Sequence, residues 1–343
     1  MKSITEAGDL KSKKVLVRVD WSVPTQDGEV LDDYPIKKSL PTIEYLQKAG
    51  AIVTLISHAE KDSESLLPIF EHARQYLPLL TFVEPSDLVL LENLRQNPGE
   101  KENSAKYAKE LAKLGDIYVN EAFPESHREY ASMVGVPKLL PSFAGLRLKE
   151  EVDKLSSVFY PNHPFLFIIG GAKFDTKLPL LKKFINIADH IFVGGALANN
   201  FFKEQGQDIG TSLVKEGNFG LKELLDTGKI ILPEDTIIDG GKIMDVGPKT
   251  IENLKSKISS SKLILWNGPL GFCELGYKVA TLELAKLISE FGHESIVGGG
   301  DTLAAIKSLD ILDKFSFVST GGGAMLDFLA TGTLPGIEAL KQD

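Results

Sequence analysis

The second half of the chain holds the feature that most limits its possible folds: five short apolar runs that each end in glycine. These runs cover residues 165–171, 190–195, 262–268, 294–300 and 315–323. Longer amphipathic segments alternate with them, and such alternation predicts a mostly parallel sheet with helices on both faces. In an open sheet of this kind, ligands bind beyond the carboxyl ends of the strands. We therefore expect function at the glycine turns.

The first half alternates in the same way, but its predicted strands end on polar residues. The strands are expected at 14–20, 51–57, 88–92 and 116–120, with helices at 37–50 and 102–115. The strand ends carry side chains that could meet a ligand, namely Asp20, Ser57, His58, Glu92, Asn93, Asn120 and Glu121. The first half thus offers side chains at the predicted sheet edge, whereas the second half offers backbone.

The length of 343 residues favours two domains, each with a doubly wound, mostly parallel sheet. The expected connector is the segment 141–164, which contains an amphipathic helix at 146–158 followed by Pro161 and Pro164. We place the N-terminal domain at 1–148 and the C-terminal domain at 149–327. The segment 328–343 is expected to pack back on the N-terminal domain.

Composition excludes several classes of protein. The apolar fraction of 43% and the charged fraction of 25% are those of a globular protein, and the apolar runs are shorter than a membrane helix needs. The net charge of −9 argues against a nucleic-acid surface. The single cysteine, Cys273, cannot form an internal disulfide or a thiolate metal cluster. We expect a cytoplasmic protein without a membrane or nucleic-acid partner.

The glycine turns favour a phosphate ligand. A strand that stops in glycine and restarts as a helix brings backbone N–H groups to the positive end of a helix dipole, where phosphate binds well. Glycine also serves tight packing between strand and helix, so a single turn is equally well explained without a ligand. Five such turns favour binding. Neither a Walker A loop nor the protein-kinase motifs occur, so the phosphates need another architecture.

Charged and polar side chains accompany these turns. Lys173 and Lys177 stand four apart at a helix start, so both ammonium groups are expected on one face beside the phosphate. Asp301 could cap a helix, bind Mg²⁺ together with phosphates, or do both. Asn267 could donate a hydrogen bond to phosphate, and Glu274 could accept one from ribose hydroxyls. Either residue could instead be a turn residue or a solvated charged or polar group.

Longer motifs carry a resemblance to a known family. They are RVDWSVP (18–24), SLPTIEYLQKAGA (39–51), LLENLRQNPGE (90–100), NEAFPESHREYAS (120–132), GGAKFDTK (170–177), WNGPLGFCE (266–274), GGGDT (298–302) and STGGGAMLDFLATGTLPGIEAL (319–340). In content and order they resemble phosphoglycerate kinase over essentially the whole chain. The resemblance implies a monomeric, hinge-bending glycolytic kinase that moves a phosphoryl group between 1,3-bisphosphoglycerate and ADP with Mg²⁺.

The resemblance also implies roles for individual residues. In the C-terminal domain the nucleotide would meet Gly171, Lys177, Gly194, Gly195, Asn267, Pro269, Glu274, Gly299, Gly300 and Thr302. Asp301 would engage the metal, and the catalytic residues would be Lys173, Gly300 and Gly323. The phosphorylated acid would meet Asp20, Ser22, His58, Lys61, Arg128 and His163.

The sequence departs from the family pattern where the acid should bind. Pro35 stands at the place of the family's central arginine, Lys61 and His163 each replace an arginine, and Ser22 replaces an asparagine. Lysine lacks the bidentate fork of arginine, and proline has no charge.

Two interpretations follow from these departures. The first, which we favour, is a phosphoglycerate kinase whose basic patch is remodelled, with Lys37, Lys38 and Lys61 partly replacing the arginines. The second is a paralogue that binds Mg-nucleotide but has lost or changed its acid substrate. A dinucleotide-dependent oxidoreductase is disfavoured, because no GxGxxG follows the first strand.

Overall fold

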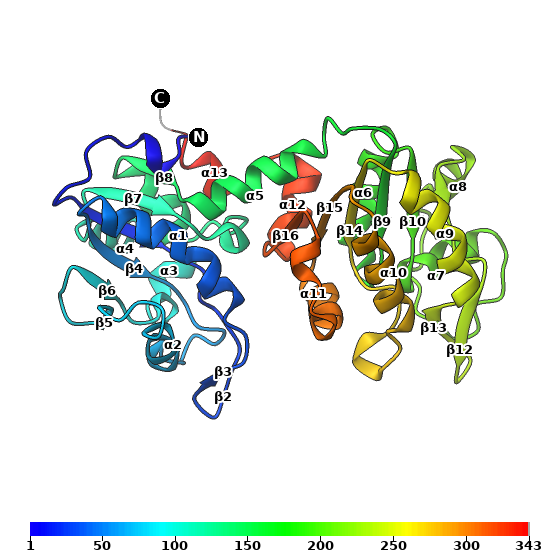
Figure 1. Cartoon of the computed structure of the whole chain (residues 1–343), viewed down its shortest axis with the longest axis horizontal. Coiled ribbons are helices and arrows are strands. Elements are labelled where there is room, and N and C mark those ends of the chain that lie inside the picture. Colours follow the sequence, from blue (N-terminus) through cyan, green and yellow to red (C-terminus); the bar gives the residue numbers. More distant parts are fainter. Residues whose placement is uncertain (342–343) are drawn as a thin grey trace. The chain divides into compact units, whose positions relative to one another are not determined.

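The computed structural model describes residues 1–341, and the chain forms two compact units. Unit 1 comprises Met1–Asp153 and the chain from Thr333 onward, and unit 2 comprises Lys154–Gly332 (Figure 1). The units divide after residues 153 and 332, each five residues beyond the expected 148 and 327. The first division falls inside helix α5 (Leu146–Ser157), so one helix carries the chain from unit 1 into unit 2.

Unit 1 contains a six-stranded sheet in the order β5-β6-β4-β1-β7-β8, with all neighbours parallel. Its strands are β1 (Lys14–Arg18), β4 (Ile52–Ile56), β5 (Thr81–Phe82), β6 (Leu88–Leu90), β7 (Ile117–Asn120) and β8 (Ser142–Ala144). A small hairpin joins β2 (Thr25–Gln26) to β3 (Glu29–Val30). The helices are α1 (Tyr34–Lys48), α2 (Leu67–Ala73), α3 (Pro98–Lys101), α4 (Ala105–Ala112) and, near the C-terminus, α13 (Pro335–Glu338). The four strands predicted in this half are confirmed, whereas β5 and β8 were missed.

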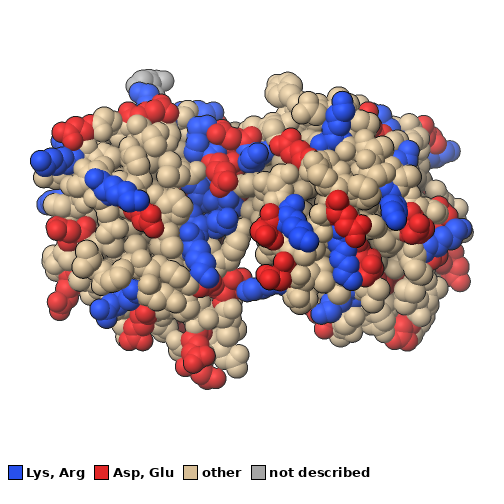
Figure 2. All heavy atoms as spheres, in the orientation of Figure 1, with Lys and Arg blue, Asp and Glu red and all other residues tan. Residues whose placement is uncertain are grey.

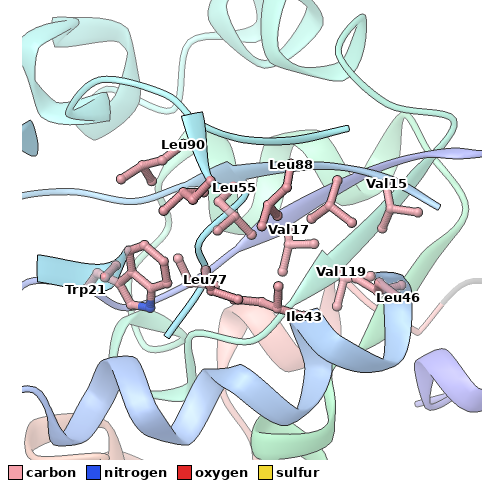
Figure 3. Close-up of a cluster of buried hydrophobic side chains, with 14 of the residues drawn as sticks. Val15, Val17, Trp21, Ile43, Leu46, Leu55, Leu77, Leu88, Leu90 and Val119 are labelled. Atoms are coloured by element: carbon pink, nitrogen blue, oxygen red, sulfur yellow. The ribbon is translucent and has the colours of Figure 1, made fainter. Parts of the chain in front are cut away.

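The core of unit 1 lies between the sheet and α1 (Figure 3). Val15 and Val17 of β1 are fully buried in the same cluster as Ile43 and Leu46 of α1. Each such side chain contributes about 1.5–3 kcal/mol through its removal from water. Trp21, which follows β1, is a buried member of the same cluster, and its indole N–H donates to the hydroxyl of Ser39 at 2.9 Å. This bond ties the chain beyond the carboxyl end of β1 to α1.

Unit 2 contains a second parallel sheet, in the order β11-β10-β9-β14-β15-β16. Its strands are β9 (Phe165–Ile169), β10 (His190–Val193), β11 (Ile230–Ile231), β14 (Leu263–Asn267), β15 (Glu294–Gly298) and β16 (Phe317–Ser319). All five glycine-ended runs are therefore strands, as predicted. An antiparallel hairpin of β12 (Thr236–Asp239) and β13 (Lys242–Val246) is added.

Every residue of β9 and β14 is buried, which shows that both faces of this second sheet are covered by helices. The helices are α6 (Phe174–Phe184), α7 (Gly195–Glu204), α8 (Leu221–Asp226), α9 (Pro248–Ser260), α10 (Val279–Glu290), α11 (Gly300–Ile306) and α12 (Gly323–Thr331). Helix α6 packs with α12, while α10 packs with α9 and α11 (Figure 1). Each unit is thus doubly wound. Within residues 1–341, no helix combines the length and the apolar character needed to cross a membrane.

Candidate functional site

Three glycine turns of unit 2 interlock at the carboxyl ends of adjacent strands β10, β9 and β14. The N–H of Gly171 donates to the carbonyl of Pro269 at 2.8 Å, and the N–H of Leu197 donates to the carbonyl of Gly171 at 3.0 Å. Gly195 has φ +59°, and a Cβ there would lie 2.5 Å from the nitrogen of Gly171. Glycine is required at this position by conformation and by space, so packing explains part of the glycine pattern.

A cavity of about 350 Å³ opens beside these turns, wholly within unit 2. Five of the residues predicted to meet nucleotide or metal line it: Gly171, Gly195, Pro269, Glu274 and Asp301. The rest of the wall is largely apolar and includes Ala198, Phe202, Leu213, Ile243, Met244 and Phe272. A cavity with apolar walls and a few polar groups at one side suits a planar ring carrying a charged group. The arrangement therefore favours a nucleotide.

The two lysines expected side by side are in different surroundings. Lys177 is only 4% exposed, and its ammonium donates to the carbonyl of Gly170 and, at 3.2 Å, to Oδ1 of Asn267. Burial lowers the pKa of Lys177 to about 8, although the charge of Asp301 opposes the shift. Lys173 is exposed at the start of α6 and lines a second cavity of about 340 Å³. Buried acceptors in two turns bind the ammonium of Lys177, while the charge of Lys173 still acts on it and helps to lower its pKa.

Asn267 and Thr302 are buried and make their hydrogen bonds within the protein. The amide of Asn267 donates to the carbonyl of Gly298 at 3.2 Å, and the hydroxyl of Thr302 accepts from the N–H of Gly268 at 2.9 Å. These bonds hold the turns after β14 and β15 in place. Both residues shape the backbone that surrounds the cavity.

Asp301 does not cap a helix, contrary to one of the two roles considered for it. Gly299 occupies the N-cap position of α11 without a side-chain cap bond, and Asp301 is the second residue of the helix. Its carboxylate is therefore available to the cavity that it lines. Within residues 1–341 no group of three or more His, Cys, Asp or Glu side chains could hold a metal ion. One carboxylate together with nucleotide phosphates is nevertheless a usual Mg²⁺ site, so the residues fit this ion.

Gly300 and Gly323 are the first residues of α11 and α12, after β15 and β16. A Cβ at either position would have no atom within 4 Å. Their surroundings are open, and N–H groups in the first turn of a helix have no partner within it. Both positions can therefore present backbone donors to an anion.

A network of buried charges lies beyond the carboxyl ends of the strands in unit 1. The guanidinium of Arg18 donates to Nδ1 of His58 at 3.0 Å, and Nε2 of His58 lies 3.5 Å from a carboxylate oxygen of Glu125. Because a guanidinium can only donate, Nδ1 is the acceptor and the proton of His58 is on Nε2. Burial and the charge of Arg18 both lower the pKa of His58. The imidazole is therefore neutral and fixed in one tautomer.

Glu125 joins this network to two further arginines. Its Oε2 lies 2.9 Å from the guanidinium of Arg95 and 3.3 Å from Nε of Arg128. Burial alone would raise the pKa of Glu125, but the hydrogen bond from His58 and the charges of Arg18 and Arg95 outweigh it and lower this pKa to about 2. The carboxylate stays ionised and holds the cations together.

Arg18 and Arg95 were given no role by the sequence. Both lie inside motifs that carry the family resemblance, at 18–24 and 90–100, and that was the available signal. In the sequence, Arg18 is the last residue of a largely apolar strand, and Arg95 comes after a strand end that already has several polar residues. Neither position by itself indicated a functional role. Their contacts with His58 and Glu125 depend on residues far away in the chain.

The other residues predicted to bind the acid differ in their placement. Asp20 follows β1 and accepts a hydrogen bond from the hydroxyl of Ser22 at 2.7 Å. The side chain of Lys61 is 76% exposed and pairs with Glu64 at 2.7 Å. His163 precedes β9, at the opposite end of that strand from Gly171, and its Nδ1 lies 2.6 Å from Asp189. A five-residue strand is about 16 Å long, so the structure does not bring His163 to the glycine turns.

Two doubly wound units, one with glycine turns around an apolar cavity and one with a cluster of cations, define a class of two-domain nucleotide-binding α/β proteins. The model of one family, described as phosphoglycerate kinase, matches residues 4–332. The chain belongs to the phosphoglycerate kinase family.

Individual relatives agree with this assignment. The chain is 38% identical to the phosphoglycerate kinase of Leptospira biflexa serovar Patoc, covering 98% of each chain. It is 40% identical to that of Orientia tsutsugamushi, covering 97% of this chain and 95% of the relative. The solved structure of phosphoglycerate kinase from Coxiella burnetii matches with a TM-score of 0.86 at 33% identity, over 98% of this chain and 97% of that one. The enzyme from Pyrococcus horikoshii OT3 matches with a TM-score of 0.87 at 28% identity, over 99% and 98%.

Proposed function

We propose that this protein catalyses reversible phosphoryl transfer from 1,3-bisphosphoglycerate to ADP, giving 3-phosphoglycerate and ATP. The observation that carries the proposal is the cavity of unit 2, where interlocked glycine turns, a carboxylate and an apolar wall meet. Membership in the phosphoglycerate kinase family supports the choice of substrates.

In this proposal the nucleotide occupies unit 2. The base lies against the apolar wall, Glu274 accepts from ribose hydroxyls, and backbone N–H groups of the glycine turns bind the phosphates. Asp301 holds Mg²⁺, which neutralises charge on the phosphates. Lys173, exposed at the start of α6, accompanies the transferring phosphoryl group, and the amides of Gly300 and Gly323 donate to its oxygens.

The phosphorylated acid occupies unit 1, beyond the carboxyl ends of β1, β4 and β7. Asp20, Ser22 and His58 provide polar contacts, and Arg128 and Lys61 provide positive charge. Because Glu125 holds Arg128 and Arg95 together, their orientation is set before substrate arrives. Such preorganisation reduces the cost of ordering side chains on binding.

Transfer between substrates held by different units requires the units to approach each other by bending of the chain between them. Closure would exclude the water that otherwise hydrolyses an acyl phosphate. A monomeric state and a cytoplasmic location complete the proposal.

A coupled assay tests this function directly. Purified protein is expected to form ATP from 1,3-bisphosphoglycerate and Mg·ADP, and Lys173→Ala is expected to abolish the activity. Binding of Mg·ADP without ATP formation above the blank, over a range of substrate concentrations, would exclude the kinase activity.

The second candidate function is a nucleotide-binding paralogue with a lost or changed acid substrate. The observation that favours it is Pro35, an uncharged residue at the start of α1. It predicts calorimetric heat with Mg·ADP and none with 3-phosphoglycerate. Heat with 3-phosphoglycerate that disappears in Arg128→Ala would reject it.

A further inference from the structure

Three lysines of unit 1 could add positive charge to the acid site, and the structure separates them by their partners. Lys37 pairs with Asp33 at 3.0 Å, and the exposed Lys61 pairs with Glu64 at 2.7 Å. Lys38 differs: throughout residues 1–341 its ammonium has no carboxylate partner, and it lies 5.0 Å from the centre of the Tyr34 ring. An aromatic face attracts a cation without neutralising it. Lys38 therefore keeps its full charge available.

The face of α1 that carries Lys38 is fixed against the carboxyl ends of the strands. Thr42 lies one turn further along the same face, and its hydroxyl donates to Glu121, directly after β7, at 2.7 Å. Ser39, the residue after Lys38, accepts a hydrogen bond from the indole N–H of Trp21, which follows β1 in the chain. Lys38 is thus held beside the edge of the sheet where Asp20 and the network around His58 lie.

The direction of the side chain brings its charge to the first turn of α1. Side chains on a helix lean toward its N-terminus and cover the preceding turn. The contact with Tyr34 agrees with this direction. The ammonium of Lys38 therefore lies over the turn that contains Pro35, where the chain itself has no charge.

Charges of both signs surround Tyr34, the ring that Lys38 contacts, because Asp32, Glu150 and Glu151 act on its phenol as well as Arg147. Arg147, at the start of α5, is buried and lies close enough to Tyr34 for its charge to act on the phenol. Arg147 is itself paired with Glu150 at 2.6 Å and Glu151 at 2.8 Å. On unit 1, Figure 2 shows Lys and Arg side chains gathered over α1 and the first turns of α5. Lys37 and Arg147 both have carboxylate partners, whereas within residues 1–341 Lys38 has none and can therefore meet an incoming anion.

We propose that Lys38 is a substrate-binding residue of the acid site, and that its ammonium contacts the anionic oxygens of the phosphorylated acid. The inference rests on the proposed function. It assigns to one lysine of α1 a charge that neither Pro35 nor the paired Lys37 can supply.

The test compares Lys38→Met with Lys38→Arg and with Lys48→Met, a control at the far end of α1 where Lys48 pairs with Glu44 at 3.4 Å. Titration calorimetry with 3-phosphoglycerate is expected to show binding weakened about tenfold or more in Lys38→Met, as for loss of a charge-assisted contact. The affinity for Mg·ADP should stay within about twofold, because the nucleotide site lies in unit 2. Lys38→Arg should keep most of the affinity, and Lys48→Met should match wild type.

The outcomes separate this inference from the function on which it rests. If wild type binds 3-phosphoglycerate and Lys38→Met binds it equally well, the role of Lys38 is overturned and the kinase function stands. The same holds if Lys37→Met, and not Lys38→Met, weakens binding. If wild type binds Mg·ADP but no 3-phosphoglycerate, the acid site as proposed and the role of Lys38 are both overturned.

Discussion

The two units build their sites differently, one from backbone and one from side chains, although each contains a six-stranded parallel sheet. Unit 2 surrounds its cavity with glycine backbone, locked turn to turn by bonds such as that from Gly171 to Pro269. Unit 1 relies on side chains, in a continuous network that joins Arg18, His58 and Glu125. A backbone site is sensitive to added atoms, and a side-chain site is sensitive to lost charge.

The largest effect is expected from adding atoms in unit 2. Gly195→Val places a branched side chain where φ is +59° and a Cβ already meets the backbone of Gly171 at 2.5 Å. We expect a loss of about 3–5 kcal/mol in the free energy of unfolding and loss of Mg·ADP binding, because strain and overpacking add. Chemical denaturation and calorimetry measure these quantities.

Gly292→Ala is the matched control, since its φ is not positive and a Cβ there would meet nothing within 4 Å. It should be nearly neutral. Normal nucleotide binding by Gly195→Val would break the claim that backbone geometry makes the site of unit 2.

Removal of charge in unit 1 should have the next largest effect. Glu125→Gln removes the anion shared by Arg95, Arg128 and His58, and we expect a loss of about 2–3 kcal/mol at neutral pH. The folded pKa of Glu125 is about 2, below the ordinary 4.5, so its stabilisation is complete above about pH 4.5 and is lost as the pH falls toward 2.

The variant should therefore unfold with a weaker dependence on pH in this acid window than wild type. Identical profiles of stability against pH would show that the network contributes no net electrostatic stability.

A smaller effect of opposite sign is expected from Glu121, also in unit 1. Burial raises the pKa of Glu121 to about 8, although bonds from Thr42 and the backbone of Arg147 oppose the shift. Because this folded pKa lies above the ordinary 4.5, the stability is full at low pH and is lost as the pH rises through about 8. Glu121→Gln should gain about 1–2 kcal/mol over wild type near pH 9. Denaturation at two pH values measures this, and a constant difference between the proteins would contradict the prediction.

The smallest effect is expected within the proposed nucleotide site, where the side chain of Lys177 is buried among the backbone turns. Lys177 has a pKa of about 8, and phosphate charges beside it should raise that value. Binding of Mg·ADP near pH 8 should therefore take up about half a proton. Calorimetry in two buffers of different ionisation enthalpy measures the uptake. Lys177→Met should abolish it if it retains binding, and equal heats in the two buffers for wild type would count against the expected shift.

The glycine-ended strands were predictable because they combine a fully apolar run with a clear stop signal. Strands β5 and β8 have only two and three residues, too few to show any period, and β8 falls within the segment assigned to the connector. Boundaries between the units were also expected slightly early, since the division lies inside the regular pattern of α5.

At the site, the sequence predicted which turns would gather but not how their side chains would be bonded. The burial of Lys177 depends on carbonyls from two turns that meet only in the folded sheet. Asp301 resembles a cap because it stands near a helix start, yet Gly299 takes that position. Arg18 follows an apolar pattern, and only its contacts with His58 and Ser132 identify it as part of a charged network.

The return of the chain to unit 1 has a consequence for the order of assembly. The N–H of Gly336 in α13 donates to the carbonyl of Ser126 at 2.8 Å, so the last helix belongs to the first unit, and unit 2 is an insertion within it. During synthesis on the ribosome, every residue of unit 2 emerges before unit 1 receives this final piece. The unit that begins first is thus completed last, and a truncation that removes α13 would damage unit 1, with its proposed acid site, while leaving unit 2 whole.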